Sequence, residues 1–264
     1  MKRFLSLVLL AAALCAAQPS YGWGQMGHDV VAAVAERHLT PKAKKHLNEI
    51  LGGRSIVYYS SWLDNVQNSP YWRDGYDVTK TWHYANVDEG YTFETMPRNE
   101  RGDVVSAVEM LSTALRSADE LPDSTKVDYT RMLVHLVGDM HCPMHAGHLT
   151  DLGGNRVKVK WFGSQTNLHS VWDSKLIESA HKWSYTEWVE QIDRSTAARQ
   201  RTIAEGQPAE WFAETVAICG GIYASTTPDS NLSYQYIYDY APVAERQLLV
   251  AGYRLARLLN EIFG

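Results

Sequence analysis

The sequence predicts a mainly α-helical protein folded as a single domain. Apolar residues recur at helical spacing along most of the chain, and an alternating strand pattern is found only at residues 155–162. No repeat, linker or low-complexity tract divides the 264 residues. With 45% hydrophobic and 21% charged residues, the composition is typical of a core-forming globular chain and excludes global disorder. We therefore expect one helical domain with a short β-hairpin near residues 155–162.

The individual helices are predicted from their apolar faces and from the signals at their ends. Thr40 is a typical N-cap, and Pro41 occupies the first position of the helix that follows. A long helix begins at Asp123, and Pro143 must end it because proline cannot continue the hydrogen-bond pattern. The remaining helices are expected at residues 29–39, 60–66, 103–118, 168–179, 185–197, 210–224 and 242–263, with polar loops at 67–80 and 91–102.

The first 22 residues are predicted to be a signal peptide and not part of the fold. Two basic residues precede an apolar stretch, residues 4–17, that is too short to span a bilayer, and small residues stand at positions 20 and 22. We therefore expect export, to the periplasm or out of the cell, and a mature domain of residues 23–264. Its 23 basic and 30 acidic side chains give a net charge of −7. That charge argues against a protein that holds duplex nucleic acid through a broad basic face.

Cysteine plays no structural role that the sequence can support. Only Cys142 and Cys219 remain after cleavage, and no Cys-x-x-Cys pair is present. Two cysteines do not form a disulfide framework, and we expect both to be unpaired. A metal would therefore have to be held by histidine and carboxylate, because no thiolate site is available.

Two His-x-x-x-Asp pairs carry the clearest chemical signal. His135 and Asp139 stand four residues apart in the string HLVGDMHCPMH, and His169 and Asp173 have the same spacing in NLHSVWD. This spacing places both side chains on one helix face, so that two such helices can line a shared interior site. His145 lies just beyond the predicted end of the first helix. Imidazole and carboxylate without thiolate suit zinc in a solvent-open catalytic site.

Spacing alone does not establish a metal site. A single pair of this kind is more often a surface ion pair or a capped core histidine. The HExxH signature of zinc proteases, the GxSxG motif and the GxxxxGK[ST] phosphate-binding loop are all absent. A thiol nucleophile at Cys142 is less favoured than a buried, inert cysteine, because no neighbouring residue in the sequence would activate it.

Six motifs in a fixed order give the sequence a specific resemblance. They are WGQMGH at 23–28, SSWLD at 60–64, WHYANV at 82–87, HLVGDMHCPMH at 135–145, GGN at 153–155 and NLHSVWD at 167–173. Together they resemble the S1/P1 family of zinc-dependent single-strand nucleases. The resemblance implies the mainly α-helical phospholipase C/nuclease fold for residues 23–264.

The resemblance further implies three zinc ions and nine ligand residues, with Asp139 and Asp64 as the catalytic carboxylates. The first ion would be held by Asp64, His83, His135 and Asp139, the second by His145, His169 and Asp173, and the third by Trp23, through its free α-amine and carbonyl, with His28 and the shared Asp139. The other histidines, His38, His46, His141, His148 and His181, match no motif position, and we expect them to be ordinary surface or core residues, with His141 and His148 as the candidates to support the ligands from behind.

The implied reaction is hydrolysis of the phosphodiester bonds of single-stranded DNA and RNA to 5′-phosphorylated products. Three Zn²⁺ and three aspartates leave a net charge of about +3 in one cleft, which explains how an acidic chain accepts a polyanion. A water held between the first and third zinc ions, which would share Asp139, would attack phosphorus, and the second ion would stabilise the leaving 3′-oxygen. The same chemistry removes the phosphate of 3′-nucleotides. No protein partner is implied.

A pocket for a base is implied next to the metal site. Tyr84 would stack on a base that has left its stack, and Asn86 and Asn155 would contact the edge of that base. Core packing for Tyr84 and a turn role for Asn155 are the alternatives. Asn86 stands where the family commonly has aspartate, so the base preference is open. Gln67 replaces a commonly basic residue, and Arg73 is one candidate for the missing phosphate contact.

Two alternative functions follow from the same residues. A zinc-dependent phospholipase C is similar in fold and in its three-zinc plan, but His28 follows Trp23 by only five residues and the last pair ends in Asp173 instead of glutamate. Both features favour the nuclease. A secreted helical protein with purely structural zinc would have sites closed by protein ligands. Preference for DNA or RNA, the pH optimum and the oligomeric state are not encoded in any motif.

Overall fold

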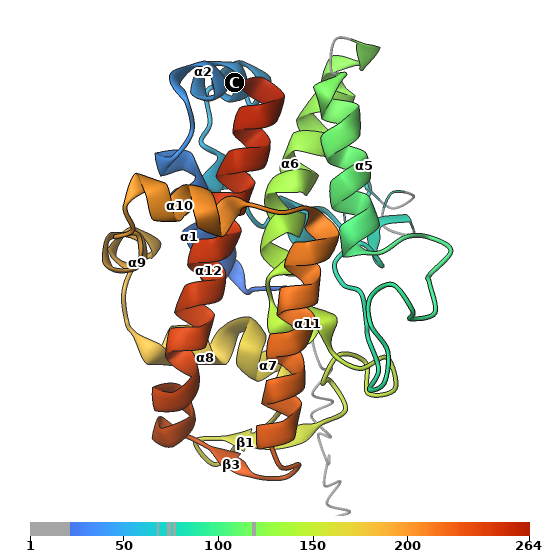
Figure 1. Ribbon diagram of the computed structural model, residues 1–264, viewed down its shortest axis with the longest axis vertical. Coiled ribbons are helices and arrows are strands. Elements are labelled where there is room, and N and C mark those ends of the chain that lie inside the picture. Colours follow the sequence, from blue (N-terminus) through green and yellow to red (C-terminus); the bar gives the residue numbers. More distant parts are fainter. Residues whose placement is uncertain (1–21, 68, 73–74, 76–77, 118–119) are drawn as a thin grey trace, which may run out of the picture.

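The computed structural model describes residues 22–264, except for residues 68, 73, 74, 76, 77, 118 and 119. The predicted signal peptide therefore lies outside the described residues, apart from Gly22. Within these residues the protein is mainly helical with one small sheet, which confirms the predicted fold class (Figure 1).

Long helices running along the vertical axis of Figure 1 build the body of the molecule. The helix α6 (Asp123–Met140) contacts α5 (Val104–Arg116), α12 (Tyr234–Phe263) and α11 (Pro208–Ser225). The helix α1 (Gln25–Arg37) packs against both α12 and α6. Every residue of α6 from Met132 to Met140 is buried, so this half of the helix is enclosed by its neighbours.

Shorter elements connect these helices and carry several candidate site residues. They are α2 (Pro41–Ile50), η1 (Ile56–Tyr59), α3 (Trp62–Val66), η3 (Pro143–Ala146), α7 (Leu168–Ser170), the π-helix η4 (Val171–Lys175), α8 (Leu176–Ala180), α9 (Tyr185–Ile192) and α10 (Ala197–Ala204).

The end signals that can be read from the sequence act as predicted. The hydroxyl of Thr40 accepts a hydrogen bond of 3.1 Å from the backbone N–H of Ala43, and Pro41 is the first residue of α2. The helix α6, which carries His135 and Asp139, ends at Met140, and Pro143 begins the separate 3₁₀ turn η3. This break sets the direction in which the chain continues toward His145.

Three helix predictions need correction. The segment predicted as one helix at 185–197 is two helices, α9 and α10, because Thr196 caps a new N-terminus by accepting from the N–H of Arg199. The helix predicted from residue 242 begins at Tyr234, and Pro242 lies inside it. The bond that Pro242 cannot make is offset by packing of the preceding turns, where Tyr236 accepts a hydrogen bond of 2.9 Å from the indole of Trp172. The helix predicted at 168–179 is interrupted by the π-helix η4.

The predicted hairpin forms one end of the molecule. Strand β1 (Lys158–Trp161) pairs antiparallel with β2 (Ser164–Asn167) and parallel with β3 (Asn231–Leu232), in the order β2-β1-β3. The tight connection at residues 162 and 163 has positive φ at both positions, as expected for the two-residue turns that suit twisted hairpins. Val159 and Trp161 face the core as their alternation predicts.

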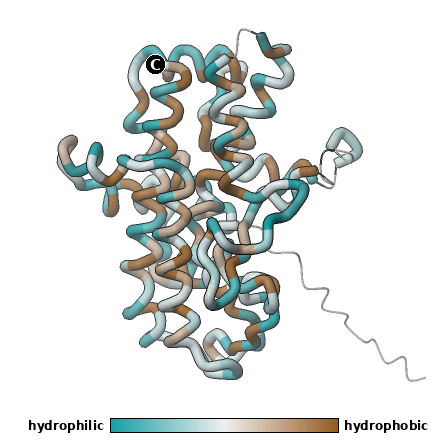
Figure 2. The backbone as a smooth tube through the Cα atoms, turned by 45° about the vertical axis from the view of Figure 1, so that its right-hand side comes forward, coloured by the Kyte–Doolittle hydropathy of each residue, from teal (hydrophilic) through white to brown (hydrophobic). Residues whose placement is uncertain are grey.

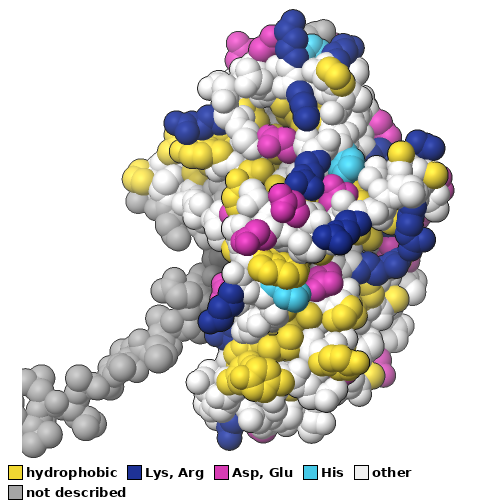
Figure 3. Space-filling view, turned by 90° about the vertical axis from the view of Figure 1, so that its left-hand side faces the viewer, with side chains coloured by type: hydrophobic (Ala, Val, Ile, Leu, Met, Phe, Trp, Pro, Cys, Tyr) yellow, Lys and Arg dark blue, Asp and Glu magenta, His cyan; other side chains and the backbone are white. Residues whose placement is uncertain are grey.

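The core is rich in tryptophan, and hydrophobic stretches lie where helices face one another (Figure 2). Trp23, Trp172, Trp188 and Trp211 are each at most 1% exposed. On the face shown in Figure 3, basic, acidic and hydrophobic side chains are interspersed, without a continuous basic surface. None of the helices in the described part of the chain has the length and hydropathy needed to cross a membrane.

Candidate metal centre

Histidine and aspartate side chains from five elements gather around the buried end of α6. Within each of three groups, of which two share His135, one potential ligand atom per residue lies within 4.8 Å of the others. The groups are His28, His135 and Asp139; Asp64, His83 and His135; and Cys142, His145 and Asp173. Seven of the nine residues predicted as ligands therefore meet here, and Cys142 joins them.

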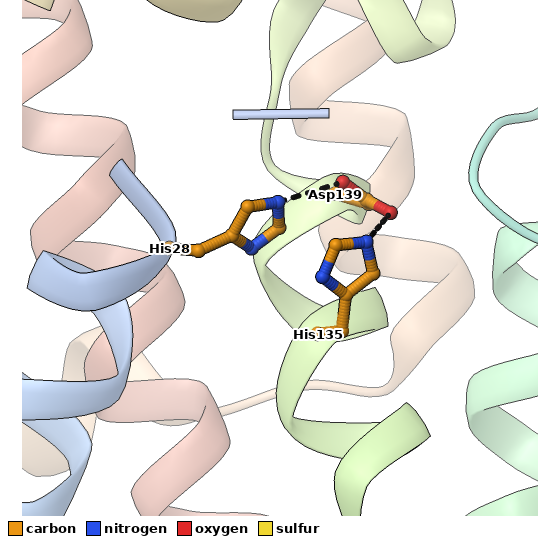
Figure 4. A group of neighbouring side chains, drawn as sticks. All are labelled: His28, His135 and Asp139. Atoms are coloured by element: carbon orange, nitrogen blue, oxygen red, sulfur yellow. Dashed lines mark ion pairs between the residues drawn. The ribbon is translucent and has the colours of Figure 1, made fainter. Parts of the chain in front are cut away.

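The pair on α6 forms the middle of the cluster. The Nε2 atom of His135 lies 3.1 Å from Oδ2 of Asp139, and both side chains are fully buried. His28 comes from α1, and its Nε2 lies 3.4 Å from Oδ1 of Asp139 (Figure 4). The rings of His28 and His135 stack with their centroids 4.0 Å apart. The two oxygens of Asp139 thus face histidines from two different helices.

A second set of donors reaches the same carboxylate from the opposite side. Nδ1 of His83 lies 2.9 Å from Oδ2 of Asp139 and 3.7 Å from Oδ1 of Asp64. Oδ1 of Asp64, on α3, also lies 3.4 Å from Nε2 of His135. His83, His135 and the two aspartates therefore enclose one point, as predicted for the first ion.

The third set adjoins the first two through His145, whose Nδ1 lies 3.7 Å from Asp139. The rings of His145 and His169 stack with centroids 5.4 Å apart, and Nε2 of His169 lies 3.1 Å from Oδ2 of Asp173. Asp173 lies in the π-helix η4, a type of turn that is frequent at functional sites. The thiol of Cys142 donates to Oδ1 of Asp173 at 3.5 Å.

Backbone carbonyls fix the orientation of three of these imidazoles. Nδ1–H of His135 donates to the carbonyl of Ser60 at 2.8 Å, and Nδ1–H of His169 donates to that of Gly153 at 2.6 Å. The same atom of His145 donates to the carbonyl of His83. A ring that donates through Nδ1 presents its Nε2 lone pair, so the carbonyls select the tautomer that a metal requires.

The start of the mature domain lies within the cluster. Trp23 is fully buried, and the backbone N–H of Gly24 donates to the carbonyl of Asp173 at 2.6 Å. In the uncleaved chain the N–H of Gly22 donates to Nε2 of His145 at 2.7 Å. Gly22, the residue directly before Trp23, therefore lies beside His28, Asp139 and His145.

Charge and burial act against each other at these side chains. Burial lowers the pKa of both His28 and His145, which favours the neutral ring. Burial also lowers the pKa of His135, but the carboxylates of Asp139 and Asp64 outweigh it and raise that pKa well above its ordinary value. Burial raises the pKa of Asp139, but His135 and His145 outweigh it and hold the pKa well below its usual range. Without a metal, these shifts favour a protonated His135 next to an ionised Asp139.

Several ligand atoms have no hydrogen-bonding partner among the described residues. Both ring nitrogens of His28, Oδ1 of Asp64 and Oδ1 of Asp139 are buried and lack such a partner. Buried polar atoms without a partner are costly. Nε2 of His28 and the two carboxylate oxygens lie in the cluster of imidazole and carboxylate donors, whereas Nδ1 of His28 lies against Gly138. The donor set therefore fits divalent metal ions, which would satisfy these atoms.

The predicted base-pocket residues lie next to this centre. Tyr84 and Asn86 line a cavity of about 180 Å³ together with Arg98 and the loop that follows it. The amide of Asn86 donates to the carbonyl of Gly147 at 2.8 Å. Asn155 lies elsewhere, because its amide donates to the carbonyl of Leu152 at 2.9 Å and it does not line the cavity. The structure therefore favours the turn role for Asn155. Arg73 lies outside the described residues.

Comparison with known proteins shows the family of the chain. A family model described as S1/P1 nuclease matches residues 23–264. The chain belongs to the S1/P1 nuclease family. The chain is thus a nuclease, and the resemblance predicted from the six motifs is confirmed.

The nuclease matches its relatives over nearly their full length. It is 28% identical to Endonuclease 2 of Arabidopsis thaliana, over 98% of this chain and 96% of the relative. It is 26% identical to Nuclease S1 of Aspergillus oryzae, over 97% of each. It is 30% identical to Nuclease P1 of Penicillium citrinum, over 92% of this chain and 98% of the relative.

The nuclease site also contains residues that sequence reasoning missed. Gly138 lets α1 approach α6, because a Cβ atom there would lie 2.9 Å from Nδ1 of His28. Ser60 supplies a carbonyl, which leaves no side-chain signal. His141 does not support the ligands as expected: it bonds to Val137 and Arg254, and burial together with Arg254 lowers its pKa to about 3. His148 instead stacks on Tyr223.

Proposed function

We propose that this nuclease is a zinc-dependent enzyme that hydrolyses phosphodiester bonds of single-stranded DNA and RNA and leaves 5′-phosphorylated products. By the same chemistry it removes the phosphate of 3′-nucleotides. The observation that carries the proposal is the convergence of five histidines and three aspartates on one buried centre, beside the backbone of Gly22 that precedes Trp23. Membership of a nuclease family supplies the phosphodiester as the bond to be broken.

Three ions would be held by the residues that the family resemblance assigns to them. Asp64, His83, His135 and Asp139 would hold the first, His145, His169 and Asp173 the second, and Trp23 with His28 and Asp139 the third. When bound, zinc would supply the Lewis acidity that activates water and neutralises the phosphate. Imidazole and carboxylate ligands favour zinc among the common metals.

The protein's own residues would hold the ligand side chains in position before the reaction. Asp139 is fully buried and faces four histidines, so it fixes the spacing between two of the ions. The carbonyls of Ser60, His83 and Gly153 hold three rings in place, so little reorganisation is needed during the reaction.

Preference for single strands would follow from the cavity beside His83. The backbone of residues 85–87 is bonded to the carbonyls of His145 and Gly147, which places Tyr84 at the edge of the centre. A cavity of about 180 Å³ lined by Tyr84 admits a base only after that base has left its stack. Duplex bases meet that requirement at a higher energetic cost.

Export is part of the proposal. The basic and apolar residues before Trp23 are arranged as in a signal peptide, and removal of residues 1–22 would free the α-amine of Trp23. The enzyme would then act in the periplasm or outside the cell.

One experiment tests the proposed activity. Mature protein beginning at Trp23 is loaded with zinc and incubated with single-stranded DNA, single-stranded RNA, duplex DNA and phosphatidylcholine vesicles. We expect cleavage of both single strands to products with 5′-phosphate ends, slower cleavage of duplex, no lipid hydrolysis, and about three zinc ions per chain by elemental analysis. Lipid hydrolysis without nucleic-acid cleavage, or 3′-phosphate ends, would contradict the proposal.

A further inference from the structure

Aromatic rings and arginines lie together on η1 and on the neighbouring face of α6. The guanidinium carbon of Arg131 lies 4.2 Å from the ring centroid of Tyr59 and 5.2 Å from that of Trp62. The guanidinium carbon of Arg54 lies 4.3 Å from the ring centroid of Tyr58. Tyr58 and Tyr59 meet edge to face, with centroids 4.9 Å apart. We call these five residues the aromatic strip.

The aromatic strip adjoins the metal centre. Arg131 precedes His135 by four residues, so both lie on one face of α6 about 6 Å apart along the axis. On the other side, Ser60 lies between Tyr59 and Trp62 in sequence and accepts the hydrogen bond from His135. The strip therefore begins one helical turn from a candidate ligand of the first ion.

Core packing accounts for part of the strip, because Tyr59 and Trp62 pack against the hydrophobic core, but it does not account for Tyr58. Tyr58 is 63% exposed, so its ring is not held by burial. Nε of Arg131 is buried without a hydrogen-bonding partner among the described residues. The nearest carboxylate to Arg131 is Asp128, with Nη1 and Oδ1 3.4 Å apart. Arg54 lines a cavity together with Glu36, so each of the two guanidinium groups lies in the neighbourhood of one acidic side chain.

We propose that the aromatic strip binds unpaired bases of the strand that continues from the scissile phosphate. The rings of Tyr58 and Trp62 stack on bases, and Arg54 and Arg131 attract the phosphates between them. Aromatic rings interleaved with cationic groups bind single strands with little sequence preference, because every base has a π-face. The inference rests on the proposed function and extends it, because it names a second contact beyond the cavity at Tyr84.

The test compares a long and a short substrate on zinc-loaded mature protein. A single-stranded oligonucleotide of about ten nucleotides reaches the strip, whereas a 3′-mononucleotide fills only the cavity at Tyr84. The Tyr58→Ala variant should raise KM for the oligonucleotide about tenfold, with kcat unchanged and both constants for the mononucleotide unchanged. Tyr238→Ala is the matched control, because Tyr238 is 80% exposed in the first turns of α12 and is not part of the aromatic strip.

A second variant and a direct measurement keep the proposal separable from the proposed activity. Trp62→Leu should act in the same direction as Tyr58→Ala, after thermal unfolding has shown that the half-buried site still folds. If the wild type cleaves neither substrate, the proposed activity fails, and fluorescence anisotropy with a labelled oligonucleotide decides the strip. Binding about tenfold weaker in Tyr58→Ala than in Tyr238→Ala supports the strip. Equal KM values, or equal affinities, in those two variants overturn it.

Discussion

Asp139 is the residue whose replacement tests the metal centre most directly. Its carboxylate is fully buried and lies within 4 Å of four histidines: His83 at 2.9 Å, His135 at 3.1 Å, His28 at 3.4 Å and His145 at 3.7 Å. We expect Asp139→Asn to abolish hydrolysis while the fold survives. Asparagine keeps the shape of the side chain but removes the charge that two ions would share.

The size of the effect follows from the number of ions involved. If each of the two ions contributes about 3 kcal/mol to stabilising the transition state, losing both slows hydrolysis about 10⁴-fold. The loss of folding stability has a separate upper limit. Removing one partner of a buried pair costs about 3–5 kcal/mol at most, and less here because His135 can release its proton. Activity should therefore fall far more than stability.

A matched control separates the two effects. Asp193 is also a buried aspartate, with His38 at 2.9 Å and the hydroxyl of Tyr253 at 2.6 Å, but it lies outside the metal centre. Asp193→Asn should lower the free energy of unfolding and leave zinc content and kcat at wild-type values. The assays are elemental analysis, urea unfolding, and hydrolysis of single-stranded DNA. An Asp139→Asn protein that matches the Asp193→Asn protein in zinc content and rate would refute the assignment.

Three further predictions concern the metal, the base pocket and the thiols. Chelation of all three ions should lower the thermal midpoint by roughly 15–30 °C and zinc should restore it, since each ion at 100 times its Kd adds about 2.7 kcal/mol. An unchanged midpoint on calorimetry would argue against metal coupled to the fold. Tyr84→Ala should raise KM for single strands about tenfold while Tyr84→Phe stays near wild type, and equal KM values in steady-state assays would exclude stacking. Cys142 and Cys219 are both buried and free in the structure, and mass spectrometry of the unreduced protein should find no linked peptide pair.

Periodic and local signals made most of the fold predictable. The i, i+4 spacing of His135 and Asp139 and the break at Pro143 fix the geometry of α6 and its end, so the sequence was sufficient there. The start of α12 was not predictable, because Pro242 normally marks a first turn and only the tertiary contact between Tyr236 and Trp172 extends the helix backward. The π-helix around Asp173 has no signal in one sequence.

In the site, the side-chain ligands could be predicted from the sequence, whereas the backbone groups that orient them could not. Histidine and aspartate can be recognised in motifs, and seven predicted ligands meet in three groups. The carbonyls of Ser60 and Gly153, which orient His135 and His169, could belong to any residue type. The amide of Asn155 closes a turn onto the carbonyl of Leu152, a contact that the motif alone does not reveal.

The amine of Trp23 gives the most decisive prediction about the third ion. Before cleavage that nitrogen is the amide between residues 22 and 23, and its lone pair is delocalised into the carbonyl, so it is a poor ligand. After cleavage it is an amine with a pKa of about 8, whose proton zinc can displace. In the uncleaved chain Gly22 also lies against the carboxylate of Asp139 and donates its N–H to Nε2 of His145. Cleavage would therefore create one ligand and release two others.

The expected outcome is a loss of zinc and of activity when one residue precedes Trp23. Protein beginning at Trp23 should bind about three zinc ions, and protein that retains Gly22 should bind about one fewer and hydrolyse single-stranded DNA at least 100-fold more slowly. Because Trp23 is fully buried in both, circular dichroism and thermal unfolding of the zinc-free proteins should agree, which excludes misfolding as the cause. Equal zinc stoichiometry and equal rates in the two proteins would eliminate the N-terminal ligand. Those results would also remove the reason to propose two neighbouring zinc ions that share Asp139, since the third ion would then have only His28 and that shared carboxylate.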